Sequence, residues 1–187
     1  MSLKHLTDKK RTNKIITASQ AHRVIHDRKT LWKEMTGKVP KFQGNEMTDW
    51  GNTYEPVAIS ELENYLQDYV EEGNIFHVHK ELPLGASPDG FYEGNPVEVK
   101  CPWTQKIYPN IPEKYMWQMQ IQMEVLDKPK CIFAVWTPAM FHVEQVQRDK
   151  EFIKWYMPFV NEFLDYVKLD NEPKKWNKKP KYNKEKV

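Results

Sequence analysis

The feature that most constrains the fold is a predicted β-hairpin over residues 84–101, within the stretch GASPDGFYEGNPVEVKCPW that begins at Gly85. Two strand-like segments, 84–92 and 96–101, are separated by a turn sequence, Glu93-Gly94-Asn95. Because side chains alternate across a strand, the second segment presents two different faces. One face carries Val97, Val99 and Cys101, and the other carries Glu98 and Lys100.

The other periodic segments surround this hairpin in a defined order. Helices are expected at 19–35, 48–72, 112–126 and 149–169, and strands at 75–82, 84–92, 96–101, 131–137 and 141–147. This order predicts an α/β (α+β) fold, in which a small mixed central sheet is flanked by helices. A chain of 187 residues suits a single domain. We expect that domain over 1–169, with a basic arm at 1–14 and a flexible lysine-rich tail at 170–187.

The charge of the chain is unevenly distributed. From Lys168 to Val187 there are eight lysines and three acidic residues, a net charge of +5, which leaves −3 of the total of +2 for residues 1–167. An acidic body with a basic tail fits a protein that holds cations at one place and polyanions at another, and it fits a solubilising tail equally well. Trp176 and Tyr182 could stack on bases, although a solvated tail also explains them.

The sequence contains no run of 18 apolar residues, so no membrane span is expected. The first residues, MSLKHLTDKKRTNK, are polar and basic and lack the apolar core of a secretory signal. Cys101 and Cys131 are therefore expected to be reduced thiols in a cytoplasmic protein.

The hairpin is a candidate metal site. Asp89 lies on the first strand or just beyond it, where the hairpin can bring it beside Glu98. Two adjacent carboxylates repel each other unless a cation lies between them, and oxygen ligands favour Mg²⁺, or Mn²⁺ in its place. Lys100, on the same face, could then orient or deprotonate a water molecule or stabilise charge on a phosphate. The alternative is that Glu98 and Lys100 simply face solvent, a common pattern in antiparallel sheets.

Glu55 is a further candidate because it falls on the same helical stripe as Ile59, Leu62 and Leu66. A carboxylate on a buried stripe needs a partner. A metal ion shared with Asp89 and Glu98 would be one, and the amides at the start of the helix or an arginine would be another. Pro56 is expected in the first turn or at a kink, so the regular helix is expected to begin near Glu55.

Several blocks of the sequence resemble a known family. Pro88-Asp89 followed by Glu98-Val99-Lys100 resembles the PD-(D/E)XK nuclease signature. Four blocks in order resemble the phage lambda exonuclease family, also called the YqaJ-type viral recombinases. They are IITASQAH (15–22), WGNTYE (50–55), SPDG with EVKCP (87–102) and YMWQMQ (115–120). The resemblance covers positions 11–126, and it implies a PD-(D/E)XK restriction-endonuclease-like core.

The resemblance also implies roles for individual residues. Asp89, Glu98 and the Val99 carbonyl would hold the metal, Glu55 would complete the site, and Lys100 would position the attacking water. A pocket for a 5′-terminal phosphate would include Arg11, Ser19, Ser87 and Gln118, with Tyr115 and His22 beside it. The interval between Arg11 and Ser19 is one residue longer than usual in the family, so Lys14 could replace Arg11.

Simpler explanations exist for the pocket residues. Arg11 could belong to a mobile basic arm, Ser19 could cap a helix, and the polar stripe of Tyr115, Gln118 and Gln122 could be a solvated face. Some family members carry a further acid at the position of His79, and Glu81 lies nearby. One or two ions are therefore both allowed. Zinc binding by His22, His26, His77 or His79 with a cysteine is disfavoured, since neither CxxC nor HExxH is present.

The resulting functional hypothesis is an Mg²⁺-dependent deoxyribonuclease that degrades linear double-stranded DNA in the 5′→3′ direction. The resemblance implies a phage enzyme of the host bacterial cytoplasm that leaves 3′ overhangs for a single-strand annealing protein, and, by analogy, a homotrimer. A structure-specific or site-specific endonuclease of the same fold and a non-catalytic DNA-binding module are the alternatives.

Overall fold

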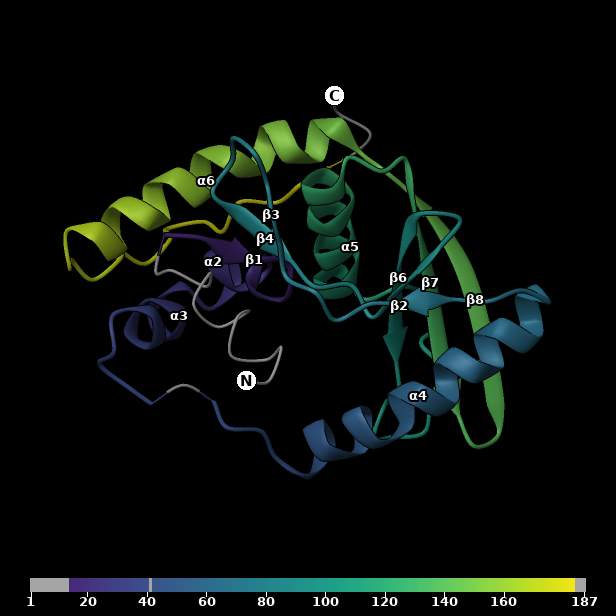
Figure 1. The fold of residues 1–187 in the computed structure, drawn as a ribbon. Helices are drawn as coiled ribbons and strands as arrows, with labels where there is room; N and C mark the ends of the chain where they lie inside the picture. The colour runs from purple at the N-terminus through teal and green to yellow at the C-terminus, as the bar shows by residue number, and fades with distance from the viewer. Residues whose placement is uncertain (1–13, 41, 184–187) are drawn as a thin grey trace, which may run out of the picture.

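A five-stranded sheet forms the centre of the fold, in the order β2-β5-β6-β7-β8 (Figure 1). The computed structural model describes residues 14–40 and 42–183. β6 and β7 run parallel, with Glu98 opposite Phe133, and the other neighbours are antiparallel. The predicted mixed sheet is therefore confirmed, but a single strand over 84–92 was wrong, because Leu84–Ala86 and Gly90–Tyr92 belong to different sheets, and the only strand found within 75–82, His77–Val78, is not part of this sheet. Its strands are β2 (Glu71–Glu72), β5 (Gly90–Tyr92), β6 (Asn95–Lys100), β7 (Lys130–Thr137) and β8 (Met140–Gln147).

Helices cover both faces of this sheet. α4 (Glu46–Leu66) packs on one face, where Ala58 and Leu62 join Val97, Val99 and Ile132 in a buried cluster. α5 (Glu113–Leu126) covers the other face, where Met119 and Met123 pack with Cys131, Phe133 and Val135. The alternation predicted for the hairpin is confirmed, because the valines of β6 face α4 and Glu98 faces α5.

A second core lies beside the first. A three-stranded sheet has the order β1-β4-β3, made of β1 (Ile16–Thr17), β4 (Leu84–Ala86) and β3 (His77–Val78). It packs with η1 (Ala18–Gln20), α2 (Arg23–His26), α3 (Arg28–Met35), α5 and α6 (Lys150–Lys168). Figure 1 shows α6 lying along α2 and across the end of α5. The fully buried Tyr156 of α6 donates a hydrogen bond to the Ala21 carbonyl at 2.8 Å, which ties the elements together.

The first predicted helix is broken into shorter pieces. Asp27, with φ −143° and ψ 39°, separates α2 from α3, so a single helix over 19–35 was wrong. Ser19 lies inside the short turn η1, and Thr17 occupies the N-cap position, where its backbone N–H donates to Gln20 Oε1 at 3.0 Å. The expectation that Ser19 caps a helix was therefore also wrong.

α4 differs from its prediction at both ends. It begins at Glu46, after Asn45 accepts a hydrogen bond from the Thr48 N–H, so Pro56 lies well inside the helix and not in its first turn. The helix ends where Gln67 adopts a left-handed conformation, φ 55°, which turns the chain so that Val70 is buried against the sheet. Among the described residues, none of the helices is both long and apolar enough to cross a membrane.

The described part of the C-terminal segment lies against the protein. The Trp176 indole N–H donates to the Ile25 carbonyl at 3.0 Å, and the Tyr182 hydroxyl donates to Asp149 Oδ2 at 3.0 Å. The guanidinium of Arg28, itself buried, lies 4.1 Å from the Trp176 ring centroid. Trp176 and Tyr182, which the sequence suggested for base stacking, therefore make contacts within the chain.

Candidate active site

Glu98 is the most deeply placed carboxylate of the hairpin, with no exposed surface. Its Oε1 accepts hydrogen bonds from Lys100 Nζ and from Gln118 Nε2, the latter at 2.6 Å, and its Oε2 accepts one from Gln122 Nε2 at 2.5 Å. The polar face of β6 is therefore covered by α5, and the alternative of a solvated strand face was wrong. A buried carboxylate with this many donors is held in one orientation.

Asp89 precedes β5 and reaches across to β6. Its Oδ2 accepts the Val99 N–H at 2.7 Å, and its own N–H donates to the Val97 carbonyl at 3.0 Å. Burial raises the pKa of the Asp89 carboxyl well above its usual range, and the negative charges of Glu98 and Glu55 raise it further, against the opposing effect of Lys100. Burial and the neighbouring carboxylates therefore both disfavour the ionised form of Asp89, and a divalent cation bound at the site would offset that effect.

Lys100 provides the cationic group of the site. Burial by itself would lower the pKa of the Lys100 ammonium, but the charges of Glu98 and Asp89 and the hydrogen bond to Glu98 raise it above its usual value. The side chain is 22 % exposed, and its Nζ lies 5.1 Å from the centroid of the Tyr115 ring. Lys100 is therefore positively charged at neutral pH, which favours a role in orienting groups and stabilising charge over one as a proton acceptor.

Glu55 approaches from α4, on the opposite side of the sheet from α5. Its Oε1 accepts a hydrogen bond from Asn74 Nδ2 at 3.2 Å. Burial raises the pKa of the Cys101 thiol to about 11, and the charge of Glu55 contributes to that shift as it does for Asp89. The ligand atoms of Glu55, Asp89 and Glu98 do not all lie within 4.8 Å of one another. The charge of Glu55 is felt at Asp89, and a metal ion shared by the three carboxylates stays a prediction.

The site depends on neighbours that the sequence analysis did not assign to it. A Cβ atom on Gly73 would lie 2.4 Å from the Asp89 carbonyl carbon, so only glycine allows this close approach. The next residue, Asn74, donates its N–H to the Pro88 carbonyl at 2.7 Å as well as its side-chain amide to Glu55. The sequence analysis gave Gly73-Asn74 no role beyond following the helix expected at 48–72. Gln122 was likewise missed, although its spacing of four residues from Gln118 on one helical stripe was a usable signal.

The residues predicted to surround a 5′-phosphate lie on α5, on the segment before α2 and between β4 and β5. Tyr115 lies at the hairpin, with its hydroxyl 3.4 Å from that of Tyr108, while Gln118 bonds to Glu98. Ser19 is exposed, with its Oγ 3.2 Å from Thr17 Oγ1, and Ser87 is half-buried two residues before Asp89. Arg11 lies outside the described residues.

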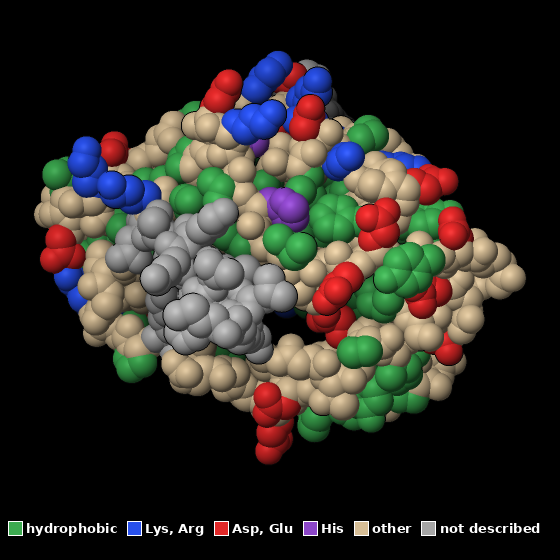
Figure 2. Space-filling model, viewed as in Figure 1, with side chains coloured by type: hydrophobic (Ala, Val, Ile, Leu, Met, Phe, Trp, Pro, Cys, Tyr) green, Lys and Arg blue, Asp and Glu red, His purple; other side chains and the backbone are tan. Residues whose placement is uncertain are grey.

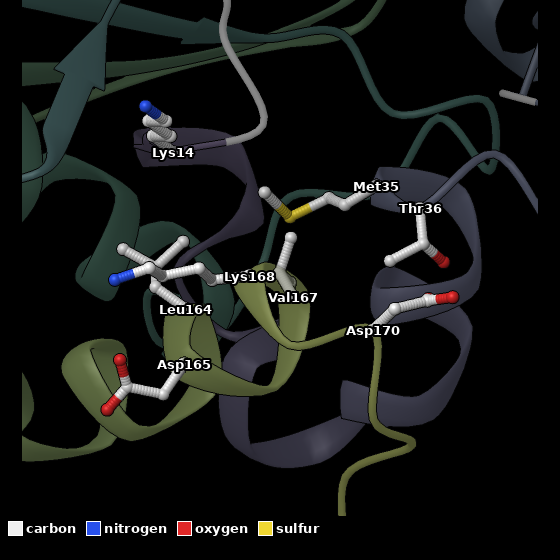
Figure 3. Close-up of a pocket in the computed structure, with 8 residues that line it drawn as sticks. All are labelled: Lys14, Met35, Thr36, Leu164, Asp165, Val167, Lys168 and Asp170. Carbon is white, nitrogen blue, oxygen red and sulfur yellow. The ribbon is translucent and has the colours of Figure 1, made fainter.

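His22 and Lys14 have different surroundings. His22 Nε2 lies 3.2 Å from Glu113 Oε2, at the start of α5. Lys14 lines a cavity of about 570 Å³ between α3 and the end of α6, together with Lys168 and Asp165 (Figure 3). This cavity shares no lining residue with the hairpin, so its existence adds nothing to the case for Lys14 as a phosphate ligand.

His79 is engaged away from the carboxylates of the hairpin. Its Nδ1 accepts the N–H groups of Glu81 at 3.0 Å and Leu82 at 2.8 Å, and its Nε2 lies 3.9 Å from Glu124 Oε1 near the end of α5. His79 therefore has a structural role, because its ring holds the turn at residues 79–82 that precedes β4. Glu81 is exposed.

The visible face of the molecule has an uneven charge pattern. Figure 2 shows Lys and Arg side chains mainly along the top and left of this face, near α6, where acidic side chains lie among them, while the other acidic side chains lie mostly on the right.

The central mixed sheet with helices on both faces, and the Asp89, Glu98 and Lys100 constellation at its hairpin, define a PD-(D/E)XK-type α/β core. The chain belongs to the YqaJ-like viral recombinase domain family, whose profile matches residues 9–129. No curated protein sequence matches it.

Solved structures share the fold. The alkaline exonuclease LHK-Exo from Laribacter hongkongensis is similar with a TM-score of 0.74 and 23% identity, over 89% of this chain and 93% of that one. Its complex with dAMP gives a TM-score of 0.75 at the same identity and coverage. A phage-related exonuclease from Haemophilus somnus gives a TM-score of 0.68 and 17% identity, over 83% of this chain and 94% of the other.

Proposed function

We propose that the chain is a metal-dependent deoxyribonuclease that degrades one strand of linear duplex DNA from its 5′ end. The observation that carries this proposal is the buried Glu98–Lys100 pair beside Asp89. Membership of a viral recombinase family supports it. So does the likeness to structures named as exonucleases, one of them in complex with a mononucleotide, dAMP.

The donor atoms of the site suit a hard cation. In the proposal Asp89, Glu98, the Val99 carbonyl and Glu55 hold Mg²⁺, with Mn²⁺ as a substitute, because all of them offer oxygen. When bound, such an ion supplies positive charge at the scissile phosphate and promotes ionisation of water. One ion is sufficient for this assignment, and the contacts of His79 with Glu81, Leu82 and Glu124 do not supply the further acid that a second ion would need.

The protein side chains perform the remaining tasks. Lys100 keeps its positive charge, orients the attacking water and stabilises the negative charge that develops on the phosphate. The amides of Gln118 and Gln122 fix the orientation of Glu98, so the carboxylate does not have to be ordered when DNA arrives. Tyr115 packs beside Lys100.

Polarity would come from a pocket for the 5′-terminal phosphate. Ser19, Ser87 and one cation, Arg11 or Lys14, are its proposed ligands, with Gln118 and His22 at its side. Hydroxyl and guanidinium or ammonium groups suit a phosphate dianion. Ser87 is two residues from Asp89, and η1, which carries Ser19, packs on α5. These placements support a pocket next to the hairpin.

The wider role follows from the same proposal. The enzyme would leave 3′ single-stranded overhangs for phage-type homologous recombination, and it would act with a single-strand annealing protein in the cytoplasm of a host bacterium. A homotrimer around DNA is proposed by analogy with lambda-type enzymes, and the molar mass of the chain in solution, measured by light scattering, tests it.

The decisive experiment compares linear duplexes carrying either a 5′-phosphate or a 5′-hydroxyl, each with Mg²⁺ and with EDTA. Rapid degradation is expected only with the phosphate and the metal ion together. Equal rates on the two ends would contradict the phosphate pocket while leaving the hairpin site intact. Cleavage of covalently closed circles would favour an endonuclease, and DNA binding without any metal-dependent cleavage would favour a non-catalytic module.

A further inference from the structure

Three side chains with metal-binding chemistry converge at the start of α5. The backbone N–H of His26 donates to the His22 carbonyl at 3.0 Å, so the two histidines lie one helical turn apart. Glu113, distant in sequence, begins α5, and its Oε2 lies 3.2 Å from His22 Nε2 and 3.7 Å from His26 Nε2. Within 14–40 and 42–183, this is the group of three such residues whose ligand atoms all lie within 4.8 Å of one another.

The separations fit a common ion geometry. Four ligands at about 2.0–2.1 Å in a tetrahedron lie roughly 3.3 Å from one another. The two histidine-to-carboxylate distances, 3.2 Å and 3.7 Å, are close to that value. The two histidines are four residues apart, which is also the spacing at which one helix supplies two histidine ligands to zinc. Imidazole nitrogen favours Zn²⁺ and its neighbours in the transition series over Mg²⁺, so this group differs in preference from the oxygen donors of the hairpin.

The surroundings leave one side of the group accessible. The imidazole rings stack, with centroids 3.9 Å apart and planes at 2°, and both contact the Trp117 ring edge-on at 5.2 Å and 5.6 Å. The histidine side chains are 26 % and 27 % exposed, and Glu113 is 54 % exposed. An ion lies in the plane of each imidazole that binds it, so both rings must turn out of the parallel stack, and their exposure leaves room for that rotation.

We propose that His22, His26 and Glu113 bind one transition-metal ion of the Zn²⁺ class, with water in the remaining position. The ion would join the turn at 22–26 to the start of α5, the helix that also carries Gln118 and Gln122. The proposal does not depend on the metal site at the hairpin, and it gives His22 a role as a metal ligand instead of a place beside the 5′-phosphate pocket. The sequence disfavoured zinc because neither CxxC nor HExxH is present. The third ligand proposed here, Glu113, lies 91 residues beyond His22 and belongs to no such motif.

The test uses the full chain without an affinity tag and with the substitution Asp89→Asn, which weakens metal binding at the hairpin. After removal of metals, Co²⁺ is titrated at about pH 7.5, where imidazole is neutral, and visible absorption reports coordination by nitrogen and oxygen. One equivalent is expected to bind, with displacement by Zn²⁺ but not by Mg²⁺ and with a rise in the melting temperature. Trp117 fluorescence is expected to change as the stack opens.

Three variants in the same background locate the ion. His26→Gln and Glu113→Gln are each expected to weaken Co²⁺ binding at least ~10-fold, since each removes a direct ligand. His142→Gln is the matched control, because His142 also pairs with a carboxylate, Glu144, at 2.8 Å but has no third ligand. Its affinity for Co²⁺ is expected to stay unchanged. Glu113 is exposed, so its variant should fold even if the histidine variant does not.

Two results would overturn the proposal. One is the absence of stoichiometric Co²⁺ or Zn²⁺ binding by the Asp89→Asn chain, in which case Glu113 is only a hydrogen-bond partner of the histidines. The other is equal affinity in the Glu113→Gln chain and its parent. Neither result affects the digestion of 5′-phosphorylated duplex in Mg²⁺, so the two proposals fail separately.

Discussion

At the scale of single residues, Lys100 is the side chain whose charge the site most depends on. Substitution of Lys100 by Met keeps the apolar stem and removes the ammonium that Glu98 and Asp89 share. We expect Mg²⁺-dependent degradation of linear duplex to fall by at least ~100-fold, in the range seen when a group that stabilises developing charge is removed. The rate of loss of 5′-phosphorylated duplex measures this.

Lys114→Met is the matched control for that variant. Lys114 Nζ also lies over the Tyr115 ring, 4.6 Å from its centroid. The side chains that donate hydrogen bonds to Glu98 among the described residues are instead Lys100, Gln118 and Gln122. Near-normal activity of Lys114→Met together with full activity of Lys100→Met would contradict the assignment. A melting curve of each variant separates loss of chemistry from loss of folding.

Asp89 leads to a prediction about pH. Because burial and the charges of Glu98 and Glu55 raise its pKa in the folded state, folding favours the protonated carboxyl. Its stabilising contribution is present below the unfolded pKa and is lost as the pH rises through the folded one. Without divalent ions, the wild-type chain should therefore lose stability relative to Asp89→Asn as the pH rises from about 4.5 to about 7.5.

Urea unfolding of the two chains in EDTA, at several pH values, measures this difference. Asparagine can still accept the Val99 N–H, so the hydrogen bond across the hairpin is matched. Addition of Mg²⁺ should stabilise the wild type more than the variant. A stability difference that does not depend on pH would contradict the raised pKa.

Local spacing was enough to find the residues of the hairpin itself. The alternation of β6 placed Glu98 and Lys100 together, and a short turn placed Asp89 beside them. Helical spacing grouped Gln122 with Gln118 on one stripe, but it did not show that this stripe meets Glu98, 24 residues earlier in the chain. Asn74 was missed because its contact with Glu55 joins two segments that no local period connects.

At the scale of elements, the connection between β2 and β3 determines where Asp89 lies. Gly73 fits against the peptide between Asp89 and Gly90, and an added Cβ would lie 2.4–2.5 Å from three backbone atoms. Since backbone cannot move aside as a side-chain tip can, Gly73→Ala should lower the free energy of unfolding by about 2 kcal/mol. It should also lower activity by displacing Asp89.

Gly51→Ala is the control at this scale. Gly51 lies within α4, and a Cβ there would meet nothing within 4 Å. Because alanine favours the helix, the free energy of unfolding should rise by up to about 1 kcal/mol. Denaturant unfolding of both variants measures the two changes, and equal effects would contradict the close packing at Gly73.

The elements that could be predicted well are those with a strong internal period. Helices expected at 112–126 and 149–169 are α5 (Glu113–Leu126) and α6 (Lys150–Lys168). The break at Asp27 and the end of α4 at Leu66 were missed, since both follow from tertiary packing. α2 and α3 are separate helices that each pack against α6. After α4 the chain turns, and this turn buries Val70 against the central sheet.

At the scale of the whole molecule, the C-terminal segment completes the helical core. Arg28 is sandwiched between the rings of Tyr166 and Trp176, at 5.4 Å and 4.1 Å, and its Nε has no hydrogen-bond partner among the described residues. Trp176→Ala should remove this cover and lower the free energy of unfolding by about 2 kcal/mol, less than for a fully buried ring.

Tyr69→Ala, at a ring that is 67% exposed, should change stability little and serves as the control. Thermal or denaturant unfolding of the full chain is the measurement. If Trp176→Ala melts like the wild type, the segment after α6 does not contribute to the stability of the fold.

The two amides that hold Glu98 stand one turn apart on a single helix, and this restricts how related chains can change in length. Inserting one residue between Glu113 and Gln118 would rotate everything after it by about 100° relative to the start of α5, so both amides would leave the carboxylate together. Residues 101–112 form neither a helix nor a strand, so an inserted residue there would not rotate side chains about a helix axis. Natural insertions and deletions should therefore accumulate there and be absent from the first two turns of α5.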